Sequence, residues 1–392
     1  MHHQTQARET AAALQKAADV RRQGHPLARN PVDGHAGFEH EALAQGLDAG
    51  VFAEIRPVSN LDGQFTRLGD ANLVAESQID GRNPDPIAIQ WLDTQASRLD
   101  LAKDHVARQD GHAERHGIVS PMSHPYFEVT GPMILGHRGA AGCAPENTLL
   151  SFARCLEQGA HAIESDVQVT ADGVPVLIHD RDVARISNAS SSVEELTRAE
   201  LEKLDAGHHF TIDERGTTEP DADDAFRGQG LYVPSVREAF EAFPDARFNL
   251  EIKTAANDAV EKVVELAAEL DRADRTLLTA GDDAIMKSLR KTLARRGVET
   301  ATSACISEVV AVVQSAVKSG NPPPEVQSLQ IPTRFAGRDL ITDALLCHCR
   351  ENGIQVHVWT VNDVAEMERL LDCGVDGLIT DFPGRLARLL GA

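Results

Sequence analysis

Two histidines, an arginine and two carboxylates lie close together in the chain and could act on a single phosphate ester. They are His137, Arg138, Glu164, Asp166 and His179. Imidazoles transfer protons near neutral pH and carboxylates hold hard cations, so this is the side-chain set for metal-assisted cleavage of a phosphodiester. Glu164 and Asp166 occupy positions i and i+2, and a strand would therefore place both on one face.

A second pair of charged residues, Glu251 and Lys253, has the same spacing in a later apolar stretch. On a strand these two side chains also share a face. The pair would supply a third carboxylate for a metal and a cation for phosphate oxygens.

The motifs around these residues, from about residue 133 to the C-terminus, resemble the glycerophosphodiester phosphodiesterase family of the phosphatidylinositol-phospholipase-C-like phosphodiesterase superfamily. They are His137-Arg138-Gly139, Pro145-Glu146-Asn147-Thr148, Glu164-Ser165-Asp166-Val167, Asp172-Gly173, His179-Asp180, Leu204-Asp205-Ala206-Gly207, Val233-Pro234, Glu251-Ile252-Lys253, Trp359-Thr360-Val361-Asn362 and Gly374-Val375-Asp376-Gly377-Leu378-Ile379-Thr380-Asp381.

The resemblance implies a role for each of these side chains. It implies that His137 and His179 act as general acid and base. It also implies that Glu164, Asp166 and Glu251 bind a divalent cation (Mg²⁺ or Ca²⁺) and that Arg138 and Lys253 bind the phosphate. Which histidine is the acid is left open. The implied reaction converts glycerophosphodiesters such as glycerophosphocholine to sn-glycerol 3-phosphate and an alcohol, with the glycerol 2-hydroxyl as the nucleophile.

Two alternatives stay open at this point. One is a lysophospholipase-D-like or phospholipase-C-like activity on lipid, which an exposed apolar rim around the site would favour. The other is a non-catalytic barrel used for binding, and the presence of both histidines and all three carboxylates counts against it. The chain departs from the family pattern at Ile186-Ser187, where threonines are usual, and in a polar stretch at residues 221–230. Both departures bear on substrate shape.

Composition narrows the class of partner. The chain has 392 residues, with 38 Lys and Arg against 60 Asp and Glu, and a formal charge of −22. This acidic balance disfavours a nucleic-acid or anionic-membrane surface, so we expect a small-molecule partner that binds at the site.

The six cysteines are scattered, and neither a disulfide framework nor a zinc site at Cys347-His348-Cys349 is expected. No apolar run is long enough to span a membrane and the start lacks a secretory pattern, which predicts a cytoplasmic protein without integral membrane contact. The oligomeric state is not readable.

The elements that must position these residues alternate between strand and helix, which favours a parallel sheet. We expect strands at 133–136, 162–169, 248–253, 276–279, 301–305, 328–331, 355–360 and 377–380. Eight such strands predict an α/β fold of the TIM (β/α)8 barrel type, in which strand C-terminal ends converge on one mouth. A short strand at 174–178 would return His179 to that mouth. A small insertion is expected after the second strand, at about 181–244, with a capped helix starting at Thr197.

Residues 1–121 are polar, aromatic-poor and without a sustained period, which predicts a largely disordered extension. The barrel is expected to occupy residues 122–392. Three alternatives stay open for residues 1–121: a dispensable extension, a segment that is not natural coding sequence, with the true N-terminus at Met122, and a regulatory or targeting arm.

Three further expectations concern the mouth of the barrel. Trp359 and His357 are expected to face one side of their strand, with Trp359 as an apolar wall for the glycerol moiety. A satisfied interior histidine is an equal alternative for His357, which is placed outside the mechanism. Asp180 and Asp381 are expected to support loops through hydrogen bonds. His208 and His209 are expected at the surface.

Overall fold

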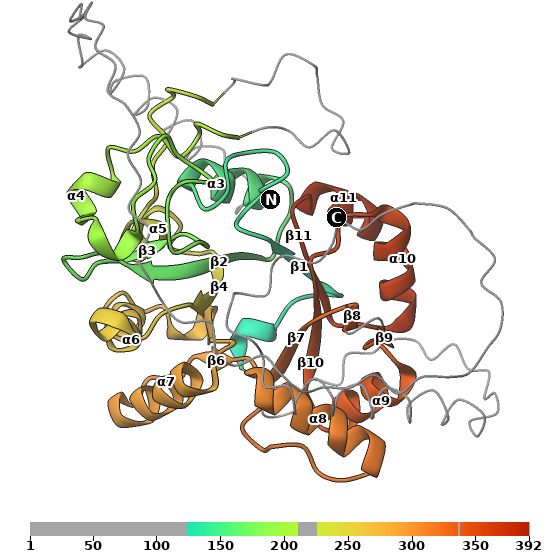
Figure 1. Ribbon diagram of the computed structural model, residues 1–392. Helices are drawn as coiled ribbons and strands as arrows, with labels where there is room; N and C mark the ends of the chain where they lie inside the picture. The colour runs from blue at the N-terminus through green and yellow to red at the C-terminus, as the bar shows by residue number, and fades with distance from the viewer. Residues whose placement is uncertain (1–123, 211–225, 336–337, 392) are drawn as a thin grey trace, which may run out of the picture. The chain divides into compact units, whose positions relative to one another are not determined.

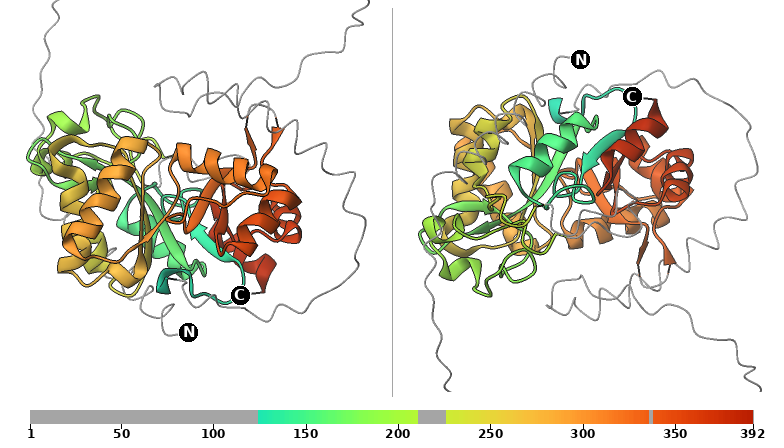
Figure 2. Two further views of the ribbon diagram at one scale, coloured as in Figure 1. Left: turned by 90° about the horizontal axis from the view of Figure 1, so that it is seen from below. Right: turned by 90° about the horizontal axis from the view of Figure 1, so that it is seen from above.

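The computed structural model describes residues 124–210, 226–335 and 338–391. Within them, the central feature is a ring of eight parallel strands wrapped by helices (Figures 1 and 2). The strands are β1 (Met133–Gly136), β2 (Ala162–Val169), β4 (Arg247–Ile252), β5 (Thr276–Thr279), β6 (Ala301–Thr302), β7 (Ser328–Pro332), β10 (Gln355–Trp359) and β11 (Gly377–Thr380). The expected extension at residues 1–121 lies outside the described residues.

The strands are hydrogen-bonded in the order β6-β5-β4-β2-β1-β11-β10-β7, which makes a nearly closed barrel. The first and last strands of the chain are neighbours, with Leu135 of β1 opposite Ile379 of β11. Between β6 and β7, the Ala304 N–H donates to the Ser328 carbonyl at 2.9 Å. The predicted TIM barrel is thus confirmed, since helices follow the strands around an almost complete ring.

The predicted strands agree with the observed ones to within one residue, except for β6. Only Ala301–Thr302 is extended there, although 301–305 was expected. Cys305 is instead the N-cap of the following helix, and its backbone N–H donates to Glu308 Oε2 at 3.0 Å. The helix cap therefore ends the strand early.

The helices cover the outside of the barrel. They are α3 (Leu149–Glu157), α5 (Val236–Ala242), α6 (Ala259–Glu269), α7 (Asp283–Arg296), α8 (Ile306–Lys318), α9 (Asp343–Glu351), α10 (Val364–Cys373) and α11 (Pro383–Leu390), with 3-10 turns η2 (Pro125–Phe127), η5 (Ala256–Asp258) and η6 (Ala273–Arg275). The Thr148 hydroxyl caps α3 by accepting from the Ser151 N–H. Gly159 follows that helix with φ +90, a left-handed angle that favours glycine just after a helix C-terminus.

Apolar side chains alternate between the two faces of the barrel wall. Phe248, Leu250 and Ile252 of β4 point outward into a core shared with α5, α6 and α7. A second outer core lies between α8–α11 and β7, β10 and β11. A smaller cluster closes the barrel floor, where Tyr126 of η2 is fully buried. The apolar residues therefore hold the wall and floor and leave the opposite end for polar chemistry.

The segment after β2 forms a small subdomain with its own core. It contains β3 (Pro175–Leu177), which pairs antiparallel with β2, then η3 (Val193–Glu195) and α4 (Arg198–Leu201). The expected cap is present, since Thr197 and Glu200 hydrogen-bond reciprocally at the start of α4. α5 falls within the expected insertion range of 181–244, yet its Phe240 packs in the outer barrel core.

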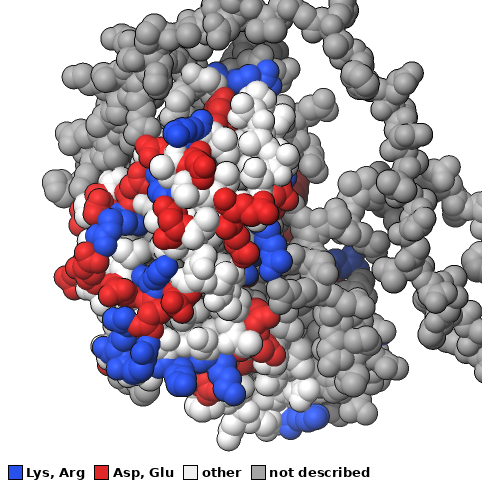
Figure 3. Space-filling view, turned by 60° about the vertical axis from the view of Figure 1, so that its left-hand side comes forward, with Lys and Arg blue, Asp and Glu red and all other residues white. Residues whose placement is uncertain are grey.

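A short hairpin of β8 (Arg334–Phe335) and β9 (Arg338–Asp339) rises after β7. None of the helices in the described part of the chain is long and apolar enough to cross a bilayer. Acidic and basic side chains are mixed on the face shown in Figure 3, with basic ones grouped along its lower edge. The six cysteines, including Cys347 and Cys349, are free.

Candidate active site

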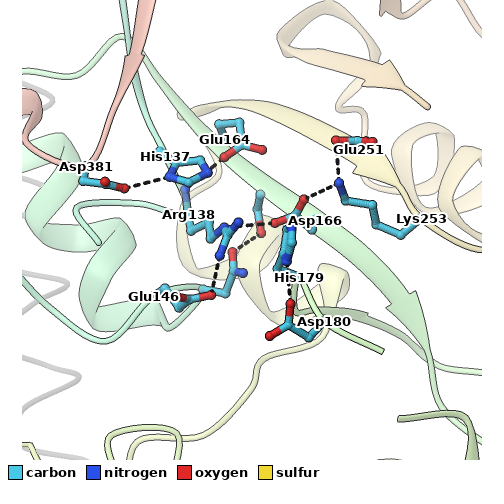
Figure 4. A network of polar contacts seen from close by, with 12 residues as sticks. His137, Arg138, Glu146, Glu164, Asp166, His179, Asp180, Glu251, Lys253 and Asp381 are labelled. Carbon is cyan, nitrogen blue, oxygen red and sulfur yellow. Dashed lines mark hydrogen bonds and ion pairs between the residues drawn. The ribbon is translucent and has the colours of Figure 1, made fainter. Parts of the chain in front are cut away.

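Two histidines lie at the mouth of the barrel, each paired with an aspartate (Figure 4). His137 follows β1, and its Nδ1 lies 2.7 Å from Asp381 Oδ1 at the end of the neighbouring β11. His179 follows β3, and its Nδ1 lies 2.7 Å from Asp180 Oδ1. The carboxylate fixes the plane of each ring, which directs Nε2 of each imidazole toward other partners.

The environment of His137 favours its protonated form. Burial by itself would lower the pKa of His137, but the hydrogen bond to Asp381 and the charge of Glu164 raise it above its ordinary value. Asp381 is itself held by Asn362, whose Nδ2 donates to Asp381 Oδ2 at 2.5 Å. The Asn362 side chain also accepts from the Asp381 N–H at 2.9 Å, so both ends of this aspartate are fixed.

The predicted carboxylates lie on two adjacent strands. Glu164 and Asp166 are buried on one face of β2, and Asp166 is opposite Glu251 of β4 in the strand register. Burial and the neighbouring charge of Asp166 raise the pKa of Glu164. Burial would also raise the pKa of Asp166, but Lys253 and Arg138 hold it below its ordinary value. The two β2 carboxylates therefore repel each other and require cations nearby.

Both predicted phosphate-binding residues already contact these carboxylates. Lys253 Nζ lies 2.8 Å from Glu251 Oε2 and 3.2 Å from Asp166 Oδ1, and so bridges two strands. Arg138 donates its backbone N–H to Glu164 Oε2 at 3.0 Å, and its Nε lies 3.4 Å from Asp166 Oδ2. Burial would lower the pKa of Lys253, but the two carboxylates raise it, so it stays charged.

The His-Arg-Gly turn requires unusual backbone angles. Arg138 has φ +51, in the left-handed region that ordinary residues rarely adopt. Gly139 follows with φ +88, and a Cβ there would lie 2.4 Å from Ser151 Oγ and 2.8 Å from the Ser151 carbonyl carbon. Only glycine satisfies both the angle and the close approach of α3.

The donor chemistry of the site suits a hard divalent cation, since all three candidate ligands are carboxylates. Asp166 Oδ2 is buried and has no hydrogen-bond partner, because its contact with Arg138 is an ion pair without hydrogen-bond geometry. As the side chains lie, no three His, Cys, Asp or Glu residues in the described ranges are grouped closely enough to hold a metal. Lys253 stands between Asp166 and Glu251, so the carboxylates supply the charge but not a finished ligand cage.

Comparison with known proteins places this arrangement in a family. The model of the glycerophosphoryl diester phosphodiesterase family matches residues 137–385, which include the whole site. The chain belongs to this family. A glycerophosphodiester phosphodiesterase of Caldanaerobacter subterraneus is 31% identical over 263 residues, covering 66% of this chain and 97% of the relative.

A solved structure and a human relative are also similar to this chain. A solved glycerophosphodiester phosphodiesterase of Agrobacterium tumefaciens has a TM-score of 0.52 and 25% identity, covering 66% of this chain and 99% of that one. A human lysophospholipase D is 25% identical over 279 residues, covering 65% of this chain and 85% of the relative. The chain is therefore an enzyme of the phosphodiesterase family, a hydrolase built on the barrel.

Sequence reasoning placed Asp180 and Asp381 in the mouth of this phosphodiesterase but did not link them to the histidines. One signal was available in each case. Asp180 is adjacent to His179 in the chain, and Asp381 ends the strand that a closed barrel places beside β1. Glu146 and Arg185 were missed as well; they lie within the motifs or just after them and contact Arg138 and Asp180.

The remaining expectations concern aromatic and histidine side chains. Trp359 ends β10 with 41% of its surface exposed, and its role as a wall for the glycerol moiety stays a prediction. His357 is fully buried, and neither of its ring nitrogens has a hydrogen-bond partner among the described residues, so it is an interior histidine but not the satisfied one that was expected. His209 is exposed and His208 partly so, with their rings 4.6 Å apart.

Proposed function

We propose that this phosphodiesterase hydrolyses glycerophosphodiesters to sn-glycerol 3-phosphate and an alcohol, with His137 and His179 as general acid and base. The observation that carries the proposal is the pair of histidine–aspartate contacts, both 2.7 Å, on either side of a cluster of buried acids and cations. A single pair would serve one proton transfer. Two pairs serve the two transfers that displacement at phosphorus requires.

The protons then balance in two stages. One imidazole takes the proton of the glycerol 2-hydroxyl as its oxygen attacks phosphorus, and the other gives a proton to the departing alcohol as its P–O bond breaks. Water opens the resulting cyclic phosphate with the two roles reversed. Asp381 and Asp180 keep each ring in the orientation that presents Nε2.

The charged residues hold the phosphate. Arg138 and Lys253 supply the guanidinium and the ammonium for its oxygens. Glu164, Asp166 and Glu251 would hold a divalent cation, Mg²⁺ or Ca²⁺, which when bound withdraws charge from the phosphate. Asp166 Oδ2, which has an ion pair with Arg138 but no hydrogen bond among the described residues, and the mutual repulsion of the β2 carboxylates support a cation there.

The experiment is release of sn-glycerol 3-phosphate from a panel of diesters, with and without a chelator. We expect turnover of glycerophosphocholine or a related diester, loss of turnover after exhaustive chelation, and recovery with Mg²⁺ or Ca²⁺. Unchanged turnover after chelation would remove the three-carboxylate metal site. Absence of sn-glycerol 3-phosphate with every diester would remove the proposed reaction.

A second candidate, lysophospholipase-D-like activity, is favoured by one observation. Among the described residues, the large apolar side chains that are strongly exposed are Ile306, Trp359 and Val364, at 53%, 41% and 44%. Ile306 and Val364 begin the helices that follow β6 and β10, and Trp359 ends β10, so all three lie at the mouth end of the barrel. Apolar side chains there could contact an acyl chain.

The two candidates separate in one comparison of substrates. If an acyl chain binds this rim, kcat/KM for lysophosphatidylcholine should exceed that for glycerophosphocholine, and Trp359→Ser should lower only the former. Equal sensitivity of both substrates to Trp359→Ser would leave glycerophosphodiesters as the substrate class, with Trp359 as the wall for glycerol.

A further inference from the structure

Arg185 connects two parts of the site that the barrel strands do not connect. It lies in the insertion after β3, and its Nε is 2.6 Å from Asp180 Oδ2. Its Nη1 and Nη2 are 2.6 and 2.7 Å from the two carboxylate oxygens of Glu146. The guanidinium therefore uses three of its nitrogens on two acids from different segments of the chain.

Each of these two acids also contacts a residue with a proposed role in the reaction. Asp180 Oδ1 holds His179 Nδ1 at 2.7 Å, while Asp180 Oδ2 receives Arg185. Glu146 Oε1 accepts from Arg138 Nη1 at 2.9 Å. A continuous series of charged contacts thus runs from His179 through Asp180, Arg185 and Glu146 to Arg138.

The geometry is specific to an arginine. A bidentate contact to Glu146 fixes the guanidinium plane, and Nε then points at Asp180 at a set angle. Glu146 is largely buried; burial would raise its pKa, but Arg185 and Arg138 hold it below its ordinary value, so it remains a charged partner for both. Side-chain hydrogen bonding by His179 likewise lowers the pKa of Asp180, with Arg185 adding to the effect.

We propose that Arg185 is a positioning residue that sets the imidazole of His179 relative to the guanidinium of Arg138, by bridging Asp180 and Glu146. The inference rests on the proposed roles of His179 and Arg138. It also gives the insertion a role, because Arg185 of the insertion joins Asp180, which follows β3, to Glu146 in the loop before α3. A misplacement of about 1 Å at such a site costs about 10²-fold in rate.

The test compares Arg185→Ala and Arg185→Lys with the wild-type protein on the best diester of the panel. Arg181→Ala is the matched control, since Arg181 is an exposed arginine in the same segment. We expect Arg185→Ala to lower kcat by about 10- to 100-fold, with a smaller change in KM. Arg185→Lys should recover only part, because an ammonium cannot hold both acids in one plane. Added guanidinium ion, below denaturing concentrations, should raise kcat of Arg185→Ala and leave Arg181→Ala unchanged.

A double-mutant cycle identifies the route. If Arg185 acts through Asp180, then Asp180→Asn and Arg185→Ala should lower kcat by much less together than the product of their separate effects. A crystal structure of Arg185→Ala should show a turned Asp180 or His179, and Arg185→Gln serves if the alanine variant does not fold. Normal kcat in a folded Arg185 variant, or full additivity with Asp180→Asn, would overturn the inference.

These outcomes differ from failure of the proposed function. A wild-type protein without turnover on any diester would refute the reaction and leave the structural comparison of Arg185→Ala to decide the positioning role. In that case an unmoved His179 in the variant would refute the bridge as well.

Discussion

At the scale of single residues, the site combines two histidine–aspartate pairs with acids that are already matched by cations. Residue type and strand spacing predicted that the two histidines, Glu164, Asp166, Arg138 and Lys253 share one site, and the structure brings these side chains together. The sequence could not identify the partner of His137. Asp381 is 244 positions away along the chain, and only closure of the ring places it there.

The Asp381–His137 contact predicts a change in pH dependence. In Asp381→Asn, burial would dominate and the pKa of His137 would fall, because the group that raises it most is gone. The limb of the kcat/KM profile governed by His137 should therefore move to lower pH, whether His137 gives or takes the proton. Asp180→Asn should lower kcat without moving that limb. An unmoved limb in Asp381→Asn would show that another group titrates in the profile.

Gly139 predicts a loss of stability with a matched control. Gly139→Ala would add a Cβ at φ +88 that overlaps Ser151, whereas Gly131→Ala adds one at φ +78 where nothing lies within 4 Å. Backbone strain alone should cost about 1 kcal/mol of unfolding free energy in both, and the overlap should add ~1–3 kcal/mol in Gly139→Ala only. Denaturant unfolding of the two variants measures this difference. Equal losses would mean that α3 moves away without cost.

At the scale of elements, strand assignments were the most predictable part of the fold. Short apolar runs between polar turns marked seven of the eight barrel strands closely. Strand β6 was predicted to be too long because Cys305, which was assigned to the strand, is the N-cap of the following helix. Apolar periodicity does not define the first residue of a helix well. The sequence did not predict that α5 packs on the barrel, because this helix follows a long polar segment that resembles an insertion.

The buried His357 in strand β10 should make the free energy of unfolding depend on pH. Burial lowers the pKa of His357 to about 4, and within the described part of the chain its ring nitrogens have no hydrogen-bond partner. The unfolded chain takes up this proton near pH 6.5 and the folded chain only near pH 4, so stability is complete above the unfolded pKa and falls as pH drops between these values. From pH 7 to pH 5 this histidine should remove about 2 kcal/mol of unfolding free energy.

The measurement is denaturant unfolding at the two pH values. His357→Leu should reduce the difference by roughly that amount, whatever its effect at pH 7, while the exposed His209→Gln should leave it unchanged. A pH dependence that is identical in wild type and His357→Leu would show that His357 has the same pKa in the folded and the unfolded chain, contrary to the effect of burial.

At the scale of the whole molecule, residues 124–391 contain the barrel, its floor and every residue assigned to chemistry. The barrel class followed from eight alternating strands and helices. The sequence did not predict that η2 closes the barrel floor, because Pro125-Tyr126-Phe127 has no periodicity to indicate that Tyr126 is fully buried.

This boundary predicts the outcome of two truncations. A chain beginning at Met122 should keep the thermal midpoint within a few degrees and retain kcat/KM, since the four apolar clusters lie entirely after it. A chain beginning at Met133 loses Tyr126 and its neighbours from the floor and should melt roughly 10 °C lower. A large drop already at Met122 would show that the preceding residues pack on the barrel as a domain.

The central claim is that two histidines move the protons of phosphodiester hydrolysis, and the most direct measurement is kcat on the best glycerophosphodiester for His137→Ala and His179→Ala. Each should lose at least ~10² in kcat, the usual contribution of a general acid or base, with an unchanged thermal midpoint. The exposed His209→Ala should retain wild-type kcat. A folded His137→Ala or His179→Ala protein with near-normal kcat would contradict the account and remove that histidine from the mechanism.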